Sequence, residues 1–554
     1  MKFSYKFSNL CGTVYKCGNV CFSADGNVLY SPVGNRVSVF DLVNHTSYTL
    51  SMETRMNISH ICVSNSGRFM IAVDVEGKAI FVNLKRRTVL YRFSFERPVT
   101  DIQFSPDDSL IAVAMERKFQ LWWTPSEKRH FAPLQKYLEV GRHFDKITSI
   151  RWSHNGDYLV TSSADMNVRI FSVGNKEGFI PVTLTGHRGD ITGAFFTEDD
   201  LQIVSVASNG AVFEWEWNRI SDEEWEKYLE YQNLKKRGKK YKVGRVTEVK
   251  SDKNESNDES EGEDQTSESE EPESESEKKG SKSEEAVESN DESSNESEND
   301  ESSDESENDE SSNESENSES DDESQSTGKP AESNNDENTN VDEKSEVRES
   351  DFPVSIYAHG RWKIKNRYFI NQAFTTITTC DYNSHARLLI LGLSTGVFSL
   401  YEMPGFNAIH TLSISNRDIS SCAINRSGDW LAFGCSTLGQ LLVWEWQSET
   451  YVLKQQGHYH NINALEFSPD GSVVATGGDD GKVKLWSLTS GFCYVTFSEH
   501  TAAVTDLCYV RGGHAIVSSS LDGTVRAFDL VRYRNFRILT TPVPVQFTCV
   551  TCDA

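Results

Sequence analysis

The sequence lacks the features that mark membrane-spanning, secreted and disulfide-stapled proteins. No apolar run approaches the roughly 18 residues that a membrane helix needs, and the opening residues, MKFSYKFSNLCGTVYK, have no unbroken apolar core of a secretory signal. The 11 cysteines are odd in number and scattered, and the lone CxxC of Cys549 and Cys552 has no second pair. We therefore expect no disulfide framework, zinc site or membrane partner, and a reducing cytosolic or nuclear compartment.

Motifs that would carry catalysis are also scarce. The sequence contains no phosphate-binding loop of the form GxxxxGK followed by Ser or Thr, and no HExxH zinc motif. We therefore expect no enzyme activity, no catalytic residues, no bound metal and no cofactor. An enzymatic propeller is kept only as a third hypothesis.

The negative charge is concentrated in one segment. The formal net charge is −29, but residues 251–350 hold 40 acidic and 7 basic side chains, so the rest of the chain carries 44 acidic and 48 basic ones. The segment has no Phe, Trp or Tyr, so it cannot bury enough apolar surface to offset its ordering entropy and is predicted to be disordered. Many of its serines precede acidic residues, which suits an acidophilic kinase, and a solvated spacer is the alternative.

A unit made of a polar turn, an apolar strand, a second turn and a second strand recurs along the chain. The second strand ends at Phe40, Val82, Trp122, Phe171, Trp215, Tyr401, Trp444, Trp486 and Phe528. The successive intervals are 42, 40, 49, 44, 186, 43, 42 and 42 residues, and all but one lie close to the roughly 40–45-residue period of a four-stranded propeller blade. The exception equals one blade plus an insertion of roughly 140 residues, which predicts an insert between the fifth and sixth units. The sequence therefore predicts an all-β propeller.

Four histidines keep a fixed distance from these strand ends. His143, His187, His458 and His500 each precede the strand-end residue of their own unit by 28 residues, and an Asp or Asn stands six residues before it, at Asp165, Asn209, Asp480 and Asp522. This pattern resembles the WD-repeat family, whose blades carry a hydrogen-bonded His–Ser/Thr–Asp–Trp tetrad. The resemblance implies four sets: His143/Ser162/Asp165/Phe171, His187/Ser205/Asn209/Trp215, His458/Thr476/Asp480/Trp486 and His500/Ser518/Asp522/Phe528.

These sets favour a structural role over a site. A catalytic triad needs one open site with an exposed nucleophile, whereas four copies of one spacing indicate architecture. His458 and His460 could bind a metal as a pair, but neighbouring residues on a strand point to opposite faces, and we expect bracing here too. Sets that end in Phe, or that carry Asn for Asp, are expected to be weaker because each loses a hydrogen-bonding group.

The unit count predicts two propellers. We expect five blades in 1–217, a basic then acidic disordered insert in 218–351, blades six and seven in 352–450, and an incomplete second propeller of two blades and a stub in 451–554. The last segment looks truncated, since two blades cannot close a ring. A single nine-bladed ring is the alternative, outside the usual range of about 4–8 blades.

Several segments resemble the periodic tryptophan protein 2 family more specifically. They are 7–20, 31–42, 433–458, 490–507 and 518–537, and they include the distinctive LGQLLVWEWQSE and DLVRYRNFR. The resemblance implies a tandem WD-repeat scaffold of the small-subunit processome, in the UTP-B subcomplex with other processome proteins. It also implies association with the box C/D small nucleolar RNP on pre-ribosomal RNA, in the nucleolus within a hetero-oligomeric complex.

Two basic stretches are candidate contact sites. In the first, arginines alternate with aromatic residues: Arg532, Tyr533, Arg534, Phe536 and Arg537. This stretch could contact RNA or a partner. The alternative is an outer strand whose arginines lie in solvent and whose aromatics pack inward. The other could be a nuclear localisation signal, an RNA patch or a counterweight to the acidic tract; it comprises Lys235, Lys236, Arg237, Lys239 and Lys240. The alternative function is a nuclear adaptor that binds histones or other basic proteins through the acidic tract.

Overall fold

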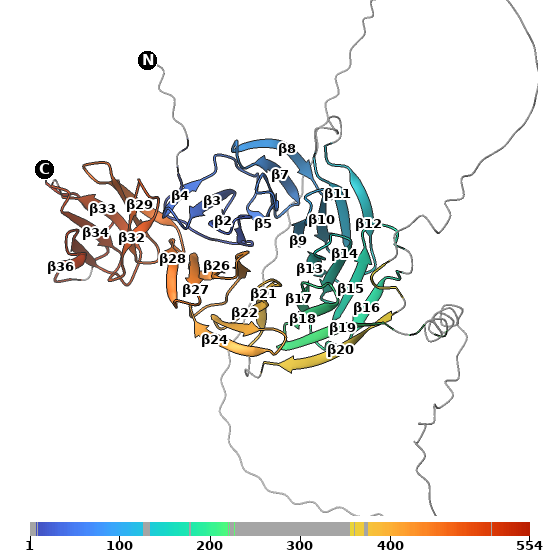
Figure 1. Cartoon of the computed structure of the whole chain (residues 1–554). Coiled ribbons are helices and arrows are strands. Elements are labelled where there is room, and N and C mark those ends of the chain that lie inside the picture. The colour runs from blue at the N-terminus through green and yellow to red at the C-terminus, as the bar shows by residue number, and fades with distance from the viewer. Residues whose placement is uncertain are drawn as a thin grey trace, which may run out of the picture. The chain divides into compact units, whose positions relative to one another are not determined.

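A computed structural model describes residues 7–553, except for 8, 126–132, 177–178, 220, 222–226, 228–354, 359, 371–374, 511 and 544. The described residues form nine four-stranded antiparallel sheets, each of which is a blade (Figure 1). The acidic tract and the basic run at 235–240 lie outside the described residues. Among the residues that are described, no helix is long and apolar enough to cross a membrane.

Blades one to four follow one another along the chain. Blade one contains β1 (Cys21–Phe22), β2 (Val28–Val33), β3 (Arg36–Asp41) and β4 (Thr46–Thr49), and blade two β5 (Ile58–Val63), β6 (Phe69–Asp74), β7 (Lys78–Asn83) and β8 (Thr88–Ser94). Blade three contains β9 (Asp101–Phe104), β10 (Leu110–Met115), β11 (Lys118–Trp123) and β12 (Lys136–Val140), and blade four β13 (Ile147–Trp152), β14 (Tyr158–Ser163), β15 (Asn167–Ser172) and β16 (Val182–Thr185).

Blades five to seven include the insertion. Blade five contains β17 (Ile191–Phe196), β18 (Gln202–Ala207), β19 (Ala211–Arg219) and β20 (Gly360–Phe369). Blade six contains β21 (Ile377–Asn383), β22 (Leu388–Leu393), β23 (Val397–Glu402) and β24 (Asn407–Ser413). Blade seven contains β25 (Ser421–Ile424), β26 (Trp430–Cys435), the 3-10 turn η2 (Ser436–Leu438), β27 (Gln440–Glu445) and β28 (Thr450–Gln456).

Two further blades follow the seventh. Blade eight contains β29 (Ile462–Phe467), β30 (Val473–Gly478), β31 (Val483–Ser487) and β32 (Cys493–Phe497), and blade nine β33 (Val504–Tyr509), β34 (Ala515–Ser520), β35 (Thr524–Asp529) and β36 (Arg534–Thr540). The innermost strands of blades one to seven contact one another in order, and β1 also contacts β25, so these seven blades close into a ring, whereas β29 and β33 contact each other in a separate pair. The predicted fold class, a seven-bladed propeller followed by the first blades of a second, is confirmed.

Burial follows the position of a strand in its blade. The second strands β10, β14 and β22 are buried at every residue, since neighbouring blades cover both faces. The sequences of β10 and β22 are correspondingly almost continuously apolar, whereas β14 ends in Thr161, Ser162 and Ser163, whose hydroxyls are hydrogen-bonded. The outer strand β8 is mostly exposed and more polar. The apolar layers between blades are therefore the core of the ring, where each large apolar side chain contributes about 1.5–3 kcal/mol on burial.

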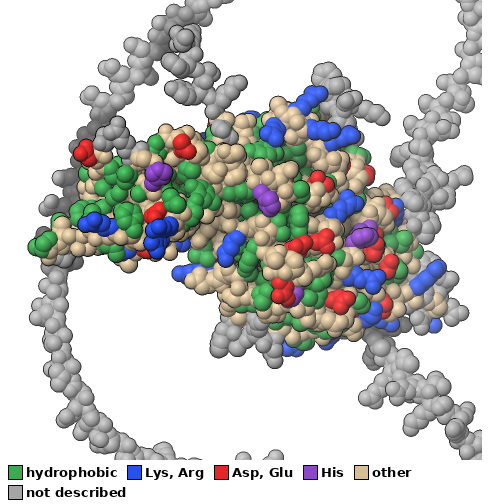
Figure 2. Space-filling model, turned by 60° about the vertical axis from the view of Figure 1, so that its left-hand side comes forward, with side chains coloured by type: hydrophobic (Ala, Val, Ile, Leu, Met, Phe, Trp, Pro, Cys, Tyr) green, Lys and Arg blue, Asp and Glu red, His purple; other side chains and the backbone are tan. Residues whose placement is uncertain are grey.

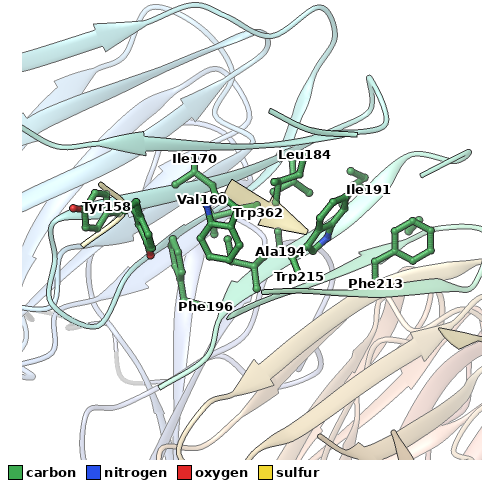
Figure 3. Packing of buried hydrophobic residues seen from close by; sticks show 14 of the residues in the cluster. Tyr158, Val160, Ile170, Leu184, Ile191, Ala194, Phe196, Phe213, Trp215 and Trp362 are labelled. Atoms are coloured by element: carbon green, nitrogen blue, oxygen red, sulfur yellow. The ribbon is translucent and has the colours of Figure 1, made fainter. Parts of the chain in front are cut away.

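The layer between blades four and five is drawn in Figure 3. Its labelled side chains include Tyr158, Phe196, Trp215 and Trp362, which are buried or nearly so. Tyr357, which follows the insertion, joins this cluster and donates a hydrogen bond from its hydroxyl to the Asp200 carbonyl at 2.5 Å. The chain that returns from the insertion is thus fixed to the ring by packing before β20 begins.

The position of the insertion corrects one prediction. β20 pairs with β19, with Arg219 opposite Gly360, so the insertion lies between the third and fourth strands of blade five and not between the fifth and sixth units (Figure 1). The strand-end residues mark the third strand of each blade, and a fourth strand always follows it. For the same reason the predicted boundary at 450 falls inside blade seven, whose last strand runs to Gln456.

The N-terminal segment seals the ring where blades one and seven meet. Each sheet is built from strands that are consecutive among the described elements, so no strand is exchanged between the ends. Instead Tyr15, 1% exposed, packs into a cluster with side chains of blades one and seven, and its hydroxyl donates to the Gly18 carbonyl at 2.5 Å. The Val20 N–H donates to Ser421 Oγ at 3.0 Å, and the His458 N–H to the Gly12 carbonyl at 2.8 Å. One segment therefore contacts blades one, seven and eight.

Candidate interaction surfaces

In blade eight the four residues of the expected set form one hydrogen-bonded network. His458 Nδ1 lies 2.9 Å from Asp480 Oδ1, and His458 Nε2 lies 2.8 Å from Thr476 Oγ1. The Trp486 indole N–H donates to the same hydroxyl at 2.9 Å. Because a carboxylate only accepts, the imidazole carries its proton on Nδ1, and Nε2 accepts from the threonine hydroxyl. The network ties the entrance of the blade to its third strand.

Blade nine has the same network without the indole. His500 Nδ1 lies 2.8 Å from Asp522 Oδ2, and Nε2 lies 2.7 Å from Ser518 Oγ. Phe528 closes the set by packing alone, stacked on Phe497 with ring centroids 4.2 Å apart. Burial lowers the pKa of His500 although the Asp522 carboxylate acts in the opposite direction.

Blade four differs from the expected set in two ways. The hydroxyl nearest His143 Nε2 belongs to Thr161, at 3.3 Å, and not to Ser162, which bonds to other serine and threonine hydroxyls instead. Asp165 does not contact the imidazole; the buried Arg169 lies between them, 3.1 Å from His143 Nδ1 and 2.8 Å from Asp165 Oδ2.

The arginine reverses the histidine's hydrogen-bonding roles in blade four. A guanidinium only donates, so Nδ1 of His143 accepts and Nε2 carries the proton toward Thr161. Burial and the Arg169 charge lower the pKa of His143 to about 4, against the opposing effect of Asp165. The imidazole is therefore neutral at physiological pH.

In blade five the expected carboxamide does not reach the histidine. Ser205 Oγ lies 2.7 Å from His187 Nε2 and accepts the Trp215 indole N–H at 2.8 Å. Asn209 Oδ1 instead accepts the Ala211 N–H, and His187 Nδ1 has no hydrogen-bond partner among the described residues. Burial lowers the pKa of His187 to about 4.

None of these networks offers an open reaction centre. The histidines are 4–7% exposed, and their hydroxyl partners are engaged. Within the described part of the chain, no group of three His, Cys, Asp or Glu side chains is placed to hold a metal ion. In each set the contacts join the loop that enters the blade to a strand within it.

One short motif, GLSTG at 392–396, matches the GxSxG pattern of nucleophile elbows. It occupies the turn between β22 and β23, a strand-to-strand turn, whereas a nucleophile elbow joins a strand to a helix. The Ser394 hydroxyl accepts the Thr376 backbone N–H at 3.2 Å. The match is therefore a turn without the context of a hydrolase.

The centre of the ring encloses a hollow of about 1030 Å³, lined mainly by the innermost strands. Arg151 and Asp101 form an ion pair of 2.6 Å there. A recurrent Asn or Asp also links each of several innermost strands to the next blade by accepting a backbone N–H: Asn19 from Ile61, Asp101 from Ile150, Asp381 from Ile424 and Asp506 from Val550, at 2.7–2.9 Å. These links were not predicted, although their spacing of 42–49 residues repeats with the blades.

The last of these links places the chain beyond blade nine. Phe547 accepts a hydrogen bond from Thr505 Oγ1 at 2.9 Å, as Ile191 does from Thr148 and Ile419 from Thr378 in the ring. Residues near 547–550 therefore occupy the position of the next innermost strand.

The predicted arginine-aromatic stretch lies on β36 and the turn before it. Arg532, Arg534 and Arg537 are exposed, and Tyr533 and Phe536 are 51% and 57% exposed. The alternative in which both aromatics pack inward is therefore wrong. Figure 2 shows hydrophobic and basic side chains interspersed on the surface of blades eight and nine, on the left of the view.

Comparison with known proteins identifies a repeat family and a set of longer relatives. The model "WD domain, G-beta repeat" matches residues 135–172, 449–487 and 491–529. Periodic tryptophan protein 2 of Arabidopsis thaliana is 35% identical over 557 residues, which cover 99% of this chain and 53% of that protein. Its mouse homolog is 37% identical over 558 residues, covering 100% and 51%. The chain thus spans about half the length of these relatives.

Two further comparisons are more limited. Pre-rRNA-processing protein IPI3 of Meyerozyma guilliermondii is 33% identical over 139 residues, which cover 22% of this chain and 30% of that protein. Among solved structures, a chain of the mitotic checkpoint complex has a TM-score of 0.46 at 9% identity, covering 80% of this chain and 93% of its own.

Proposed function

Because the chain belongs to the periodic tryptophan protein 2 family over the length that it spans, we propose that it is a non-enzymatic scaffold of nucleolar ribosome biogenesis. In this role it assembles with other UTP-B proteins and with the box C/D small nucleolar RNP on pre-rRNA, for early processing of small-subunit rRNA. The family relationship over 99–100% of the chain carries the proposal. Pre-rRNA-processing protein IPI3, which is similar to one part of the chain, is named for the same process.

The architecture is suited to holding several partners at once. The seven blades of the ring and the two blades after it expose loops and outer strands to which partners can bind. The buried histidine networks support the conformation of their blades. Fold alone does not determine function, so the partners require direct measurement.

The test is affinity purification of the tagged full chain from nucleolar extract. The proposal expects pre-rRNA, box C/D small nucleolar RNA and UTP-B proteins in the eluate, measured by reverse transcription and mass spectrometry. The structure supplies a control: Ile419, fully buried between blades six and seven, replaced by Asp, unfolds the blades and should release these partners together. An eluate of the native chain that lacks pre-rRNA and processome proteins contradicts the proposal.

A second candidate function is direct RNA contact by the β36 stretch. Its three exposed arginines can pair with phosphates, and the exposed rings of Tyr533 and Phe536 can stack on bases. Replacing the three arginines by Gln is expected to reduce RNA crosslinking, with a matched control that replaces the exposed Arg86, Arg361 and Arg417 on other blades. Equal crosslinking of the two triple variants would count against RNA contact here.

The competing role as a histone adaptor rests on the acidic tract, since acidic tracts attract basic proteins. Arg219 and Gly360 are paired across β19 and β20, so a deletion of 251–350 leaves the base of the insertion joined in the ring. Loss of histone binding on deletion, with normal rRNA processing, would favour the adaptor. Unchanged histone binding would exclude it.

The basic run at 235–240 is proposed as a nuclear localisation signal. A reporter fused to 230–245 is expected to accumulate in the nucleus, and a reporter in which Lys235, Lys236, Arg237, Lys239 and Lys240 are replaced by Gln is expected to stay outside it. Cytoplasmic retention of both reporters would remove this role.

A further inference from the structure

The outer strand of blade five, β20, is the longest outer strand among the nine blades and lies at the rim of the ring (Figure 1). It has 10 residues, whereas the outer strands of the other blades have 4–7. One edge of β20 pairs with β19, and the other edge pairs with no strand among the described residues. Such an edge offers a row of backbone N–H and C=O groups to which another chain can add as a further strand.

The side chains of β20 are unusually basic for an outer strand of this chain. Its sequence, GRWKIKNRYF, contains no Asp or Glu. Its four cations, Arg361, Lys363, Lys365 and Arg367, are all exposed. No other outer strand among the described blades contains more than two Lys or Arg residues. β20 therefore differs from the other outer strands in charge as well as in length.

Three of these cations share one face of the sheet. Trp362 and Ile364 pack into the apolar layer between blades four and five. Because successive side chains of a strand point to opposite faces, Arg361, Lys363 and Lys365 lie on the other face. We call these three residues the cationic face of β20.

One carboxylate within the sheet meets this face, and it neutralises only part of the charge. Glu216 lies opposite Lys363 in the pairing of β19 with β20, and its Oε1 lies 3.5 Å from Lys365 Nζ. Arg361 and Lys363 form no ion pair of 4.0 Å or less with any described residue. The cationic face therefore keeps a net positive charge and can attract further carboxylates.

The geometry of a β-sheet indicates which segment would fit this edge. Residues two apart on a strand are about 6.4–6.8 Å apart, and adjacent strands lie about 4.7–4.9 Å apart. An added strand with Asp or Glu at every second position would thus place a carboxylate opposite each cation, as Glu216 lies opposite Lys363. Opposite charges stabilise such cross-strand pairs, and like charges destabilise them. Two copies of β20 would bring cation against cation, so this edge disfavours pairing with a second copy of the chain.

We propose that β20 binds an extended acidic segment of a partner protein, which adds to the sheet of blade five as a fifth strand. Backbone hydrogen bonds along the free edge hold the segment, and the cationic face selects acidic residues at alternate positions. The proposal goes beyond the scaffold function, because it assigns a surface and the chemistry of its partner without requiring RNA or a UTP-B protein. It can therefore fail independently of that function.

The test is a fluorescence anisotropy titration of the purified full chain with a labelled, blocked peptide of sequence Thr-Glu-Val-Glu-Val-Glu-Thr. Two further peptides separate charge from strand pairing. One has Lys in place of each Glu, and the other has N-methyl groups on two adjacent central residues, which removes a donor from each edge and leaves the charge unchanged. Saturable binding of the first peptide is expected, weakened by about tenfold or more for the other two.

A charge reversal on the chain gives the complementary measurement. The triple variant Arg361→Glu, Lys363→Glu and Lys365→Glu is expected to lose binding of the acidic peptide and to gain binding of the lysine peptide. If this variant does not fold, Gln at the same three positions should still weaken binding of the acidic peptide by about tenfold. The matched control replaces three exposed cations elsewhere in the ring by Glu and should bind as the native chain does: Arg86, Arg417 and Lys454.

Several results would overturn the proposal. They are no saturable binding of the acidic peptide, equal binding of the N-methylated peptide, and undiminished binding by both triple variants at 361, 363 and 365. Competition by polyuridylate at equal negative charge would assign the cationic face to nucleic acid in place of an acidic protein segment. A chain lacking 251–350 is titrated in parallel, and binding by that chain alone would exclude a partner segment as the ligand of β20 in the full chain.

Discussion

His187 Nε2 lies 2.7 Å from the Ser205 hydroxyl, whereas His187 Nδ1 has no partner among the described residues. The cause lies at Asn209, whose Oδ1 accepts the Ala211 N–H and whose other terminal atom is a nitrogen that can only donate. In blade eight the equivalent Asp480 offers an oxygen to the histidine. Blade five therefore has an incomplete network.

Asn209→Asp is expected to complete that network. A carboxylate oxygen would accept from His187 Nδ1, raise the pKa of the imidazole and add about 1 kcal/mol to the free energy of unfolding. Thermal denaturation at pH 7 checks this, with the exposed Asn416→Asp as control. An unfolding temperature no higher than that of the native chain would show that the aspartate does not reach the imidazole.

The two depressed histidine pKa values predict acid sensitivity. His143 and His187 have a pKa of about 4 in the folded chain, against an ordinary value near 6.5 in the unfolded chain. Below pH 6.5 the unfolded state binds more protons, so the stability they contribute is present above that pH and is lost as pH falls toward 4. At pH 5 each histidine is expected to cost the fold at most about 2 kcal/mol.

The measurement is the change in unfolding temperature between pH 7 and pH 5. A double variant with Gln at His143 and His187 should be less stable at pH 7 but should lose less on acidification, because the two titrating groups are gone. An equal loss in the native chain and the double variant would place the acid sensitivity elsewhere.

The sequence predicted the repeating parts of this structure better than the departures from the repeat. The 28-residue spacing identified the histidines, and an 18-residue spacing from histidine to hydroxyl, shared by Ser205, Thr476 and Ser518, would have selected Thr161 over Ser162. The role of Arg169 could not be predicted from spacing. Its side chain lies between His143 and Asp165, and the repeat pattern contains no arginine at that place. The fourth strand of blade five also escaped, since roughly 140 residues separate it from its partner and strand pairing leaves no local signal across that distance.

The seam between blades one and seven gives a prediction about ring closure. Tyr15 is buried in the seam, and an added Cβ at Gly434 of blade seven would lie 2.6 Å from its ring. Tyr15→Phe removes the contacts of the hydroxyl with the Gly18 carbonyl and Ser420 Oγ and is expected to lower the free energy of unfolding by about 1 kcal/mol, whereas Tyr15→Ala opens a cavity and should cost about 3–5 kcal/mol. Urea denaturation measures both, with the half-exposed Tyr459→Ala as control. A Tyr15→Ala variant as stable as that control would mean that the N-terminal segment does not hold the ring closed.

Two glycines with similar φ angles test whether close packing or backbone conformation determines how much stability is lost when glycine is replaced by alanine. Gly77 has φ +84° and an added Cβ would lie 2.0 Å from the Arg97 carbonyl oxygen, whereas Gly471 has φ +69° and no atom within 4 Å of an added Cβ. Both alanine variants bear the penalty of a left-handed residue, about 1–2 kcal/mol. Only Gly77→Ala must also displace the chain that leaves β8, so its unfolding temperature should fall well below that of Gly471→Ala. Equal unfolding temperatures would show that the loop around Arg97 yields without cost and that backbone conformation alone explains the glycine.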